Sequence, residues 1–216
     1  GGGLVYRFLK AAGSRYMQFM PVYEHIAPDD RIAPPAEEDS VLAPWSVEPE
    51  AFGRYLCDIF DLWVRGDVGK YFVLTFDAAL SSWCGVHPGI CTFCESCGGN
   101  LTVEHNGDIY PCDHFVYPQW RLGNIRDISL REAATSPALT RFGLAKRTEL
   151  PEKCLRCPWL RACRGGCPKH RFASASSSAL PLCPGYSLFY EHIAPVMDKM
   201  KALLSEGRAP SEIVFQ

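Results

Sequence analysis

The sequence predicts an α/β segment followed by a small, cysteine-rich α+β module. A helix-like stretch and a strand-like stretch follow one another near the amino terminus, and a long amphipathic helix is expected from residue 49. From residue 81 to residue 183 cysteine, glycine and proline are dense, and long periodic segments are few. We therefore expect an α/β part over residues 1–80, a cysteine-rich module over 81–184, and a helix with a tail over 185–216.

The composition is that of an ordinary soluble globular protein, with 47% hydrophobic and 21% charged residues in a chain of 216. A net charge of −2 gives no broad electrostatic field, so we expect neither nucleic acid nor a membrane as a partner. No stretch reaches the ~18 apolar residues of a spanning helix, and the amino terminus lacks the features of a signal peptide. The expected location is the cytoplasm. The chain opens on glycines without Met, which indicates either added residues or a fragment.

The α/β part begins with a helix over residues 4–12, whose apolar face we expect to contain Leu4, Val5, Phe8 and Leu9. Gly13 is a suitable stop for this helix. Residues 16–22 form a short apolar run, which predicts a buried strand.

Residues 26–49 are rich in Pro, Asp and Glu, which is typical of a surface loop. Pro49 then opens a predicted helix that extends to about Val64, with aromatic and aliphatic residues along one buried face. Residues 71–76 read as another short β-rich run.

The cysteine-rich module contains a predicted hairpin over residues 101–110, because Asn106-Gly107 supplies the positive φ angles of a tight turn. Residues 130–144 are weakly helical, and residues 185–204 have the pattern of a final amphipathic helix. Residues 174–178 are mostly serine and are expected to form a short flexible loop.

Eleven cysteines indicate metal binding rather than disulfides. Their number is odd, no export signal is visible, and several stand in CX2C and CX3C spacings. Residues 154–168 form the pattern CX2CX5CX3C followed by proline. A tight CX2C lets one loop deliver two sulfurs to one metal centre, and thiolates suit zinc or iron–sulfur clusters.

Counting the cysteines suggests two four-thiolate sites. Cys91, Cys97 and Cys112 are three ligands without a fourth, whereas five cysteines lie from residue 154 to residue 183. In bacterial ferredoxins the last cysteine before a proline can ligate the other cluster. Assigning Cys167 to the first group therefore gives two sets of four.

At these residues the sequence resembles the SPASM domain of radical S-adenosylmethionine (SAM) enzymes. Within that family the anaerobic sulfatase-maturating enzymes are most similar to segment 101–116, LTVEHNGDIYPCDHFV, and to segments 122–125 and 165–172. The resemblance covers roughly residues 4–205, and residues 18–22 are similar to a late strand of the family's barrel. It implies the C-terminal part of a partial (β/α)6 radical SAM barrel, followed by a SPASM domain with two cluster sites.

Carried over by the resemblance, the first auxiliary [4Fe–4S] cluster would be held by Cys91, Cys97, Cys112 and Cys167, and the second by Cys154, Cys157, Cys163 and Cys183. Asp113 matches the family's proposed base for the target residue. The implied reaction is oxidation of a cysteine or serine of a sulfatase polypeptide to formylglycine. The implied partners are this polypeptide and an electron donor such as a flavodoxin or ferredoxin.

Two departures from the family pattern limit these expectations. The SAM-cluster motif CX3CX2C is absent, so SAM and a third [4Fe–4S] cluster are expected only in the full-length enzyme, and this part alone should be inactive. Cys94 is an extra thiol between Cys91 and Cys97, either a spare buried cysteine or an alternative ligand.

Plainer interpretations stand beside these. Asp113 could be a turn residue, Glu104, His105, Asp108 and His114 have weaker claims on the site, and Cys57 and Cys84 are expected to be buried small hydrophobes. A basic rim for a peptide is possible, but a solvated face is the better account of Arg161, Arg164, Lys169 and Arg171. Two other functions remain open: a SPASM maturase of another peptide, and a non-catalytic electron carrier or zinc-stabilised binding module.

Overall fold

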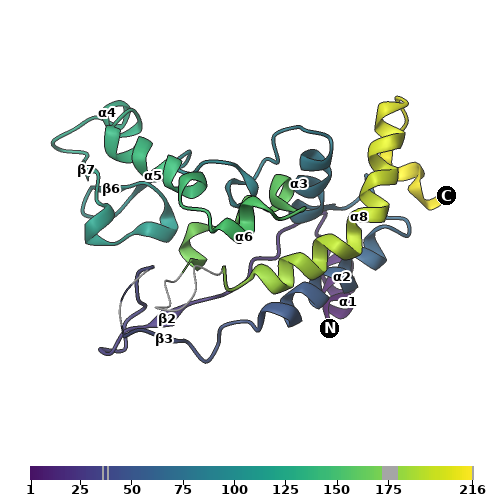
Figure 1. Cartoon of the computed structure of the whole chain (residues 1–216), viewed down its shortest axis with the longest axis horizontal. Helices are drawn as coiled ribbons and strands as arrows, with labels where there is room; N and C mark the ends of the chain where they lie inside the picture. Colours follow the sequence, from purple (N-terminus) through teal and green to yellow (C-terminus); the bar gives the residue numbers. More distant parts are fainter. Residues whose placement is uncertain (36, 38, 172–179, 216) are drawn as a thin grey trace.

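The computed structural model describes residues 1–35, 37, 39–171 and 180–215. Two long helices, α2 (Pro49–Trp63) and α8 (Cys183–Ser205), lie side by side and form the main packing contact of the molecule (Figure 1). Helix α1 (Gly2–Ala11) packs on α2, and α3 (Leu74–Trp83) packs on α8. The sequence predicted α2 and α8 to within two residues at each end.

The buried face of α2 is the expected one, with Leu56, Ile59, Phe60 and Trp63 at most 1% exposed. Helix α8 supplies the opposing apolar residues, and the cysteine-rich part adds Phe93 and Ala162 to the same cluster. One continuous core therefore joins residues from all three expected segments. Helix α3 also crosses the boundary expected near residue 80, and the division into domains stays a prediction.

Two glycines allow α2 and α8 to approach closely. A Cβ at Gly53 would lie 2.5 Å from the carbonyl oxygen of Gly185, and one at Gly185 would lie 2.0 Å from the carbonyl oxygen of Pro49. No real Cβ tolerates such distances, so both positions exclude any side chain. This contact fixes the start of α8, and with it Cys183.

The strands are short. β1 (Tyr16–Met17) pairs in parallel with β4 (Phe72–Val73). β2 (His25–Ile26) pairs antiparallel with β3 (Val41–Leu42). A three-stranded antiparallel sheet contains β5 (Thr102–Val103), β6 (Asp108–Tyr110) and β7 (Gly123–Asn124). Mixed helices and strands agree with the predicted α/β and α+β character.

Three details of the amino-terminal part differ from the sequence prediction. The strand expected over residues 16–22 contains only two residues, of which Tyr16 is 78% exposed. The β-rich run expected over residues 71–76 ends at Val73, where α3 begins. Helix α1 buries Gly2 and Tyr6 rather than Leu4 and Phe8, because Gly2 lies against the backbone of α2 and the Tyr6 hydroxyl donates to Asp67 Oδ2 at 2.8 Å.

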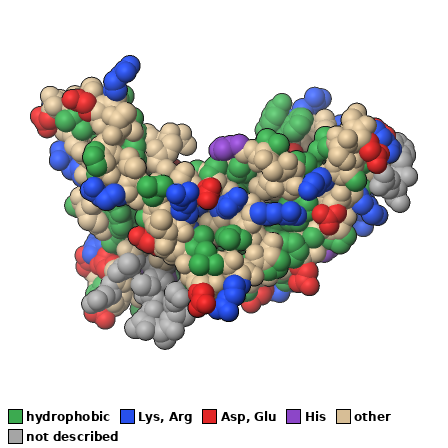
Figure 2. Space-filling model, turned by 45° about the horizontal axis from the view of Figure 1, so that its top comes forward, with side chains coloured by type: hydrophobic (Ala, Val, Ile, Leu, Met, Phe, Trp, Pro, Cys, Tyr) green, Lys and Arg blue, Asp and Glu red, His purple; other side chains and the backbone are tan. Residues whose placement is uncertain are grey.

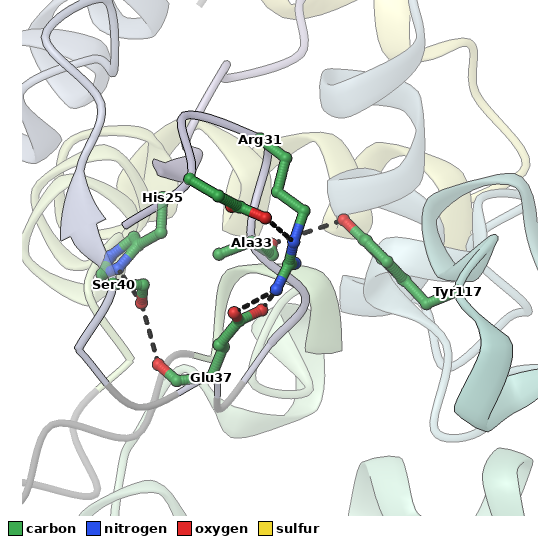
Figure 3. A network of polar contacts seen from close by, with 7 residues as sticks. His25, Arg31, Ala33, Glu37, Ser40 and Tyr117 are labelled. Atoms are coloured by element: carbon green, nitrogen blue, oxygen red, sulfur yellow. Dashed lines mark hydrogen bonds and ion pairs between the residues drawn. The ribbon is translucent and has the colours of Figure 1, made fainter. Parts of the chain in front are cut away.

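The loop between β2 and β3 is held by polar contacts, which Figure 3 shows. The Arg31 guanidinium donates to the Glu37 carboxylate, with one N–H···O distance of 2.8 Å, and Tyr117 donates to the Ala33 carbonyl oxygen at 3.4 Å. Tyr117 precedes the 3-10 helix η3 (Pro118–Trp120), so this contact ties the loop to the cysteine-rich part.

The predicted hairpin is present, with Thr102 opposite Tyr110 and Val103 opposite Ile109. Its turn differs from the expected primed type. Of the four described residues 104–107, only Gly107 has a positive φ, and its N–H donates to the Glu104 carbonyl oxygen at 2.8 Å. This combination indicates a type I turn followed by a glycine bulge.

The weakly helical stretch over residues 130–144 is two helices, α4 (Leu130–Ala134) and α5 (Pro137–Thr148), separated at Ser136-Pro137. Short helices α6 (Glu152–Leu155) and α7 (Leu160–Cys163) follow, and 3-10 segments are η1 (Cys91–Phe93), η2 (Asp113–Phe115), η4 (Pro168–His170) and η5 (Pro210–Phe215). The serine-rich loop expected at 174–178 lies outside the described residues.

The surface seen in Figure 2 mixes acidic, basic and hydrophobic side chains, in keeping with the net charge of −2. None of the helices in the described residues is long and apolar enough to cross a membrane.

Candidate metal centres

The four cysteines expected to form the first site line one pocket of about 390 Å³. They come from four places in the chain: Cys91 opens η1, Cys97 follows it, Cys112 precedes η2, and Cys167 precedes η4. The volume is within the range of small-ligand sites, about 300–1,000 Å³. Electrostatic interactions link Cys167 with Cys91 and Cys97, and Cys112 with Cys167.

Helix α5 holds the loop that carries Cys91 and Cys97. A Cβ at Gly143 would lie 2.6 Å from the Cys97 carbonyl oxygen, so only glycine permits this approach. The Cys97 N–H donates to the Gly143 carbonyl oxygen at 3.1 Å. One turn further along α5, Lys146 donates to the carbonyl oxygens of Cys91 and Thr92 at 2.5 and 2.8 Å.

The second expected group also gathers in one place. Cys154 lies in α6, Cys157 just after it, Cys163 ends α7, and Cys183 begins α8. Electrostatic interactions link Cys163 with Cys154, Cys157 and Cys183. The cysteines of each predicted set therefore lie near one another, and their assignment to two separate four-cysteine sites stays a prediction.

Only three residues separate Cys163 of one group from Cys167 of the other. All three have left-handed backbone conformations, with φ of 48° at Arg164, 74° at Gly165 and 63° at Gly166. Two of them are glycines, for which this conformation has no steric cost, whereas Arg164 is strained. Cys163 and Cys167 flank this left-handed link, and both also line a small pocket with Cys183.

Several thiols of the two predicted sites have raised pKa values because they are buried. Burial raises the pKa of Cys112 and Cys163 to about 12, and that of Cys167 to about 11. Because the ligating form is the thiolate, a bound metal must displace these protons and supply the charge that stabilises the anions. All eleven cysteines, each within the described residues, are free thiols.

Within the described parts of the chain, no three His, Cys, Asp or Glu side chains converge closely enough to hold a single metal ion. A four-iron cluster needs a wider arrangement of thiolates than one ion does, because its iron and sulfide atoms stand between them.

Two cationic side chains near the cysteines, one buried and one partly buried, would also suit a negatively charged cluster. Lys146 is 1% exposed and interacts with Cys91, Cys97 and Cys167, while the partly buried Arg171 interacts with cysteines of both sites. In addition, the buried Nδ1 of His170 has no hydrogen-bond partner among the described residues. Buried charges and buried polar atoms require partners, and thiolate-bound clusters would supply them.

Asp113 lies on the wall of the four-cysteine pocket, with its side chain 76% exposed. The Cys112 thiol donates to Asp113 Oδ1 at 3.1 Å, and this hydrogen bond is the main cause that lowers the pKa of Asp113. A ligated Cys112 would have no proton to donate, so the bond belongs to the metal-free thiol. The backbone N–H of His114, 3.4 Å from Cys112 Sγ, is a donor that a thiolate could keep.

Of the four residues with weaker claims on the site, one lines the four-cysteine pocket and three do not. His114 lines the pocket, with Nδ1 3.6 Å from Cys167 Sγ and Nε2 3.9 Å from Asp113 Oδ2. Glu104 and His105 lie at the hairpin turn, and Asp108 accepts from Arg121, Asn124 and Asn106 within the sheet, so none of these lines the pocket.

The extra thiol Cys94 faces another pocket. Its Sγ lies 3.3 Å from His87 Nε2 and donates to the Ile90 carbonyl oxygen at 3.3 Å. Cys84 lines this same pocket and is half-buried, which corrects the expectation of a buried thiol, whereas Cys57 is buried as expected.

The solvated-face interpretation is wrong for two of the four basic residues. Lys169 is 6% exposed, donates to the Tyr117 hydroxyl at 2.5 Å and lies 3.2 Å from Glu24 Oε2. Arg171 lies between the two cysteine groups. Sequence reasoning missed Lys146 entirely, because a single lysine in the last turn of a helix carries no signal of burial.

The chain is similar in sequence to an iron–sulfur cluster-binding domain and to two groups of enzymes. The SPASM family, an iron–sulfur cluster-binding domain, matches residues 91–158. The chain is 44% identical to a serine-type anaerobic sulfatase-maturating enzyme of Bacteroides thetaiotaomicron, over 97% of this chain and 52% of that protein. It is 30% identical to a cysteine-type enzyme of Clostridium perfringens, over 88% of this chain and 50% of that protein.

A solved structure, native anSMEcpe with bound AdoMet and the Cp18Cys peptide, has a similar fold. The TM-score is 0.75 at 26% identity, covering 92% of this chain and 53% of that one. The chain spans about half the length of the curated relatives it matches.

Proposed function

We propose that this chain is part of a radical SAM oxidoreductase of the anaerobic sulfatase-maturating type. Its support is the SPASM match and the sequence and fold similarity to these enzymes, of whose length the chain covers about half. The proposed reaction of the whole protein is oxidation of a serine or cysteine of a sulfatase polypeptide to formylglycine. SAM and a third [4Fe–4S] cluster belong to the whole protein, because this chain lacks the CX3CX2C motif.

One observation carries the proposal: four cysteines from distant parts of the chain line the same pocket as Asp113. We assign the first auxiliary cluster to Cys91, Cys97, Cys112 and Cys167, and the second to Cys154, Cys157, Cys163 and Cys183. When bound, the clusters would supply a route for the electron that the oxidation releases.

Asp113 is the proposed base. Forming a carbonyl or thiocarbonyl at the target residue requires loss of a proton from its hydroxyl or thiol, and a carboxylate can accept that proton. Its exposed side chain is open to a peptide that enters the pocket. His114 contributes a second polar group on the same wall.

The proposed partners are the sulfatase polypeptide and an electron donor such as a flavodoxin or ferredoxin. Thiolate clusters and free cysteines suit the reducing cytoplasm, where we place the reaction. Neither nucleic acid nor a membrane has a role in it.

The first test is metal analysis of the protein purified without oxygen. We expect about eight irons and about eight acid-labile sulfides per chain, since two cubane clusters contain four of each. A colourless protein that contains zinc and no sulfide would refute the clusters and favour a zinc-stabilised module.

The second test uses the full-length protein with SAM, a reductant and matched sulfatase peptides that differ only in Ser or Cys at the target position. We expect a formylglycine mass change on at least one peptide. Turnover of an unrelated peptide, with none on either sulfatase sequence, would favour maturation of another substrate.

A further inference from the structure

Two positively charged side chains, Lys146 and Arg171, lie inside the cysteine-rich part, close to its thiols. Lys146 is 1% exposed, and among the described residues its ammonium group donates only to backbone carbonyl oxygens, those of Cys91 and Thr92. Arg171 Nη1 donates to the carbonyl oxygen of Lys146 itself at 2.8 Å. The two cations are thus built into one hydrogen-bonded unit.

Neither cation has a carboxylate partner in the part of the chain that the structure describes. Their charged neighbours are each other and the cysteines. Two like charges placed together away from water are costly unless anions lie nearby. The cysteine thiolates are the anions that the described residues offer.

The two cations face different sets of cysteines. Lys146 interacts with Cys91, Cys97 and Cys167, all of the first site. Arg171 interacts with Cys97 and Cys167 of the first site and with Cys154 and Cys163 of the second. Arg171 is therefore shared by the two sites, and Lys146 belongs to one.

The left-handed link, residues 164–166, contacts the Arg171 side chain through two of its carbonyl oxygens. The guanidinium lies 3.4 Å from the Gly165 carbonyl oxygen and 3.5 Å from that of Arg164. A Cβ at Gly165 would lie 2.8 Å from Arg171 Nη2, so the glycine makes room for the cation. The segment that separates the two sites thus also holds the charge between them.

We propose that Lys146 and Arg171 are fixed positive charges that set the reduction potentials of the two clusters, Lys146 acting on the first cluster and Arg171 on both. This inference rests on the proposed function, because it requires both clusters. Reduction adds one negative charge to a cluster, and a cation held nearby in a poorly solvated environment stabilises the reduced form. Lys146 and Arg171 are positioning residues, since neither needs to touch the substrate.

The experiment is a redox titration of the purified, cluster-containing protein, followed by electron paramagnetic resonance. We expect Lys146→Met to lower the reduced-to-oxidised ratio of the first cluster about tenfold at its wild-type midpoint, a shift of about 59 mV for one electron. Arg171→Met should lower this ratio for both clusters. Lys146→Arg and Arg171→Lys keep the charge and should stay near the wild-type potentials.

The matched control is Arg141→Met, which removes an exposed cation from the same helix as Lys146 and should leave both potentials unchanged. Full iron content with unchanged potentials in both neutral variants would overturn the inference and leave the proposed function intact. Wild-type protein without iron and sulfide would instead overturn the proposed function, and the inference with it.

A neutral variant that loses its clusters is also decisive. Loss in Lys146→Met with retention in Lys146→Arg means that the site needs the charge, which supports the inference. Loss in both means that the site needs the shape of lysine, which overturns it. The same comparison applies to Arg171→Met and Arg171→Lys.

Discussion

Cys112 and Asp113 are neighbours in sequence, yet they meet opposite environments on the wall of one pocket. Burial raises the pKa of the Cys112 thiol to about 12, while the Asp113 carboxylate is 76% exposed and its pKa is lowered. The Cys112 thiol is suited to bind a metal, which would replace its proton. The exposed Asp113 carboxylate is suited to contact a substrate that enters the pocket.

Asp113→Asn tests the role of the carboxylate. Asparagine keeps the size of the side chain but cannot accept the proton, so we expect formylglycine formation by the full-length protein to fall about 10²-fold or more. Iron and sulfide content should stay at the wild-type level. Undiminished turnover would remove the assigned role, and His105→Gln at the distant hairpin turn serves as the control that should stay active.

Asp77, in the first turn of α3, gives a test of stability against pH. Burial raises its pKa to about 6, so the folded protein keeps this proton to a higher pH than the unfolded chain does. The ionised form is penalised above the folded pKa, and the penalty disappears as pH falls toward the unfolded value of about 3.9.

We therefore expect Asp77→Asn to raise the free energy of unfolding at pH 8, and to raise it less at pH 5. A pKa difference of about two units corresponds to ~3 kcal/mol. Because the side chain is partly solvated, we expect a smaller gain in the free energy of unfolding at pH 8, on the order of 1 kcal/mol. Urea unfolding at both pH values measures it. An equal effect of Asp77→Asn at both pH values would contradict the assignment, and a variant of an exposed residue, Glu191→Gln, serves as the control.

At the scale of elements, the contact between α2 and α8 positions Cys183 for the second site. Gly185→Ala would place a Cβ 2.0 Å from the Pro49 carbonyl oxygen, and the helices would have to separate. We expect a loss of about 1–3 kcal/mol in the free energy of unfolding, as for an overpacked core, together with reduced iron in the second cluster.

Chemical denaturation and iron analysis check this prediction. Gly66→Ala is the matched control, because a Cβ there meets nothing within 4 Å. Full iron content and wild-type stability in Gly185→Ala would show that Cys183 does not depend on the helix contact.

The elements that could be predicted are those with a one-sided apolar pattern. Helix α2 buries one continuous face, which the 3.6-residue period reveals. Helix α3 was missed because it buries residues around much of its circumference, including Thr75, Phe76 and Ala78, so no such period appears. The cysteine groups followed from spacing and family pattern, whereas the burial of Lys146 and Arg171 depends on tertiary packing that no local pattern encodes.

At the scale of the whole molecule, the apolar core is concentrated in the helices, and the cysteine-rich part contributes fewer buried side chains. Because its loops, short helices and small sheet bury little apolar surface, we expect the proposed clusters to contribute to its stability. On this proposal, metal binding is coupled to folding in the cysteine-rich part and not in the paired helices.

Removal of iron by a chelator under reducing conditions tests this coupling. We expect amide hydrogen exchange to become fast over residues 91–124 and 150–171, while α2 and the middle of α8 keep their protection. Unchanged protection throughout would show that the cysteine-rich part folds without metal, and re-addition of iron and sulfide should reverse the loss.

The left-handed link between Cys163 and Cys167 has a consequence for distance. Four peptide units, even fully extended, span at most about 14 Å between the two Cα atoms, and a left-handed backbone is shorter than an extended one. The backbone is therefore a covalent tether between the two proposed clusters. A partner that shifts the surrounding helices can move this pair, but the two Cα atoms stay within this limit in any rearrangement that leaves the peptide bonds intact.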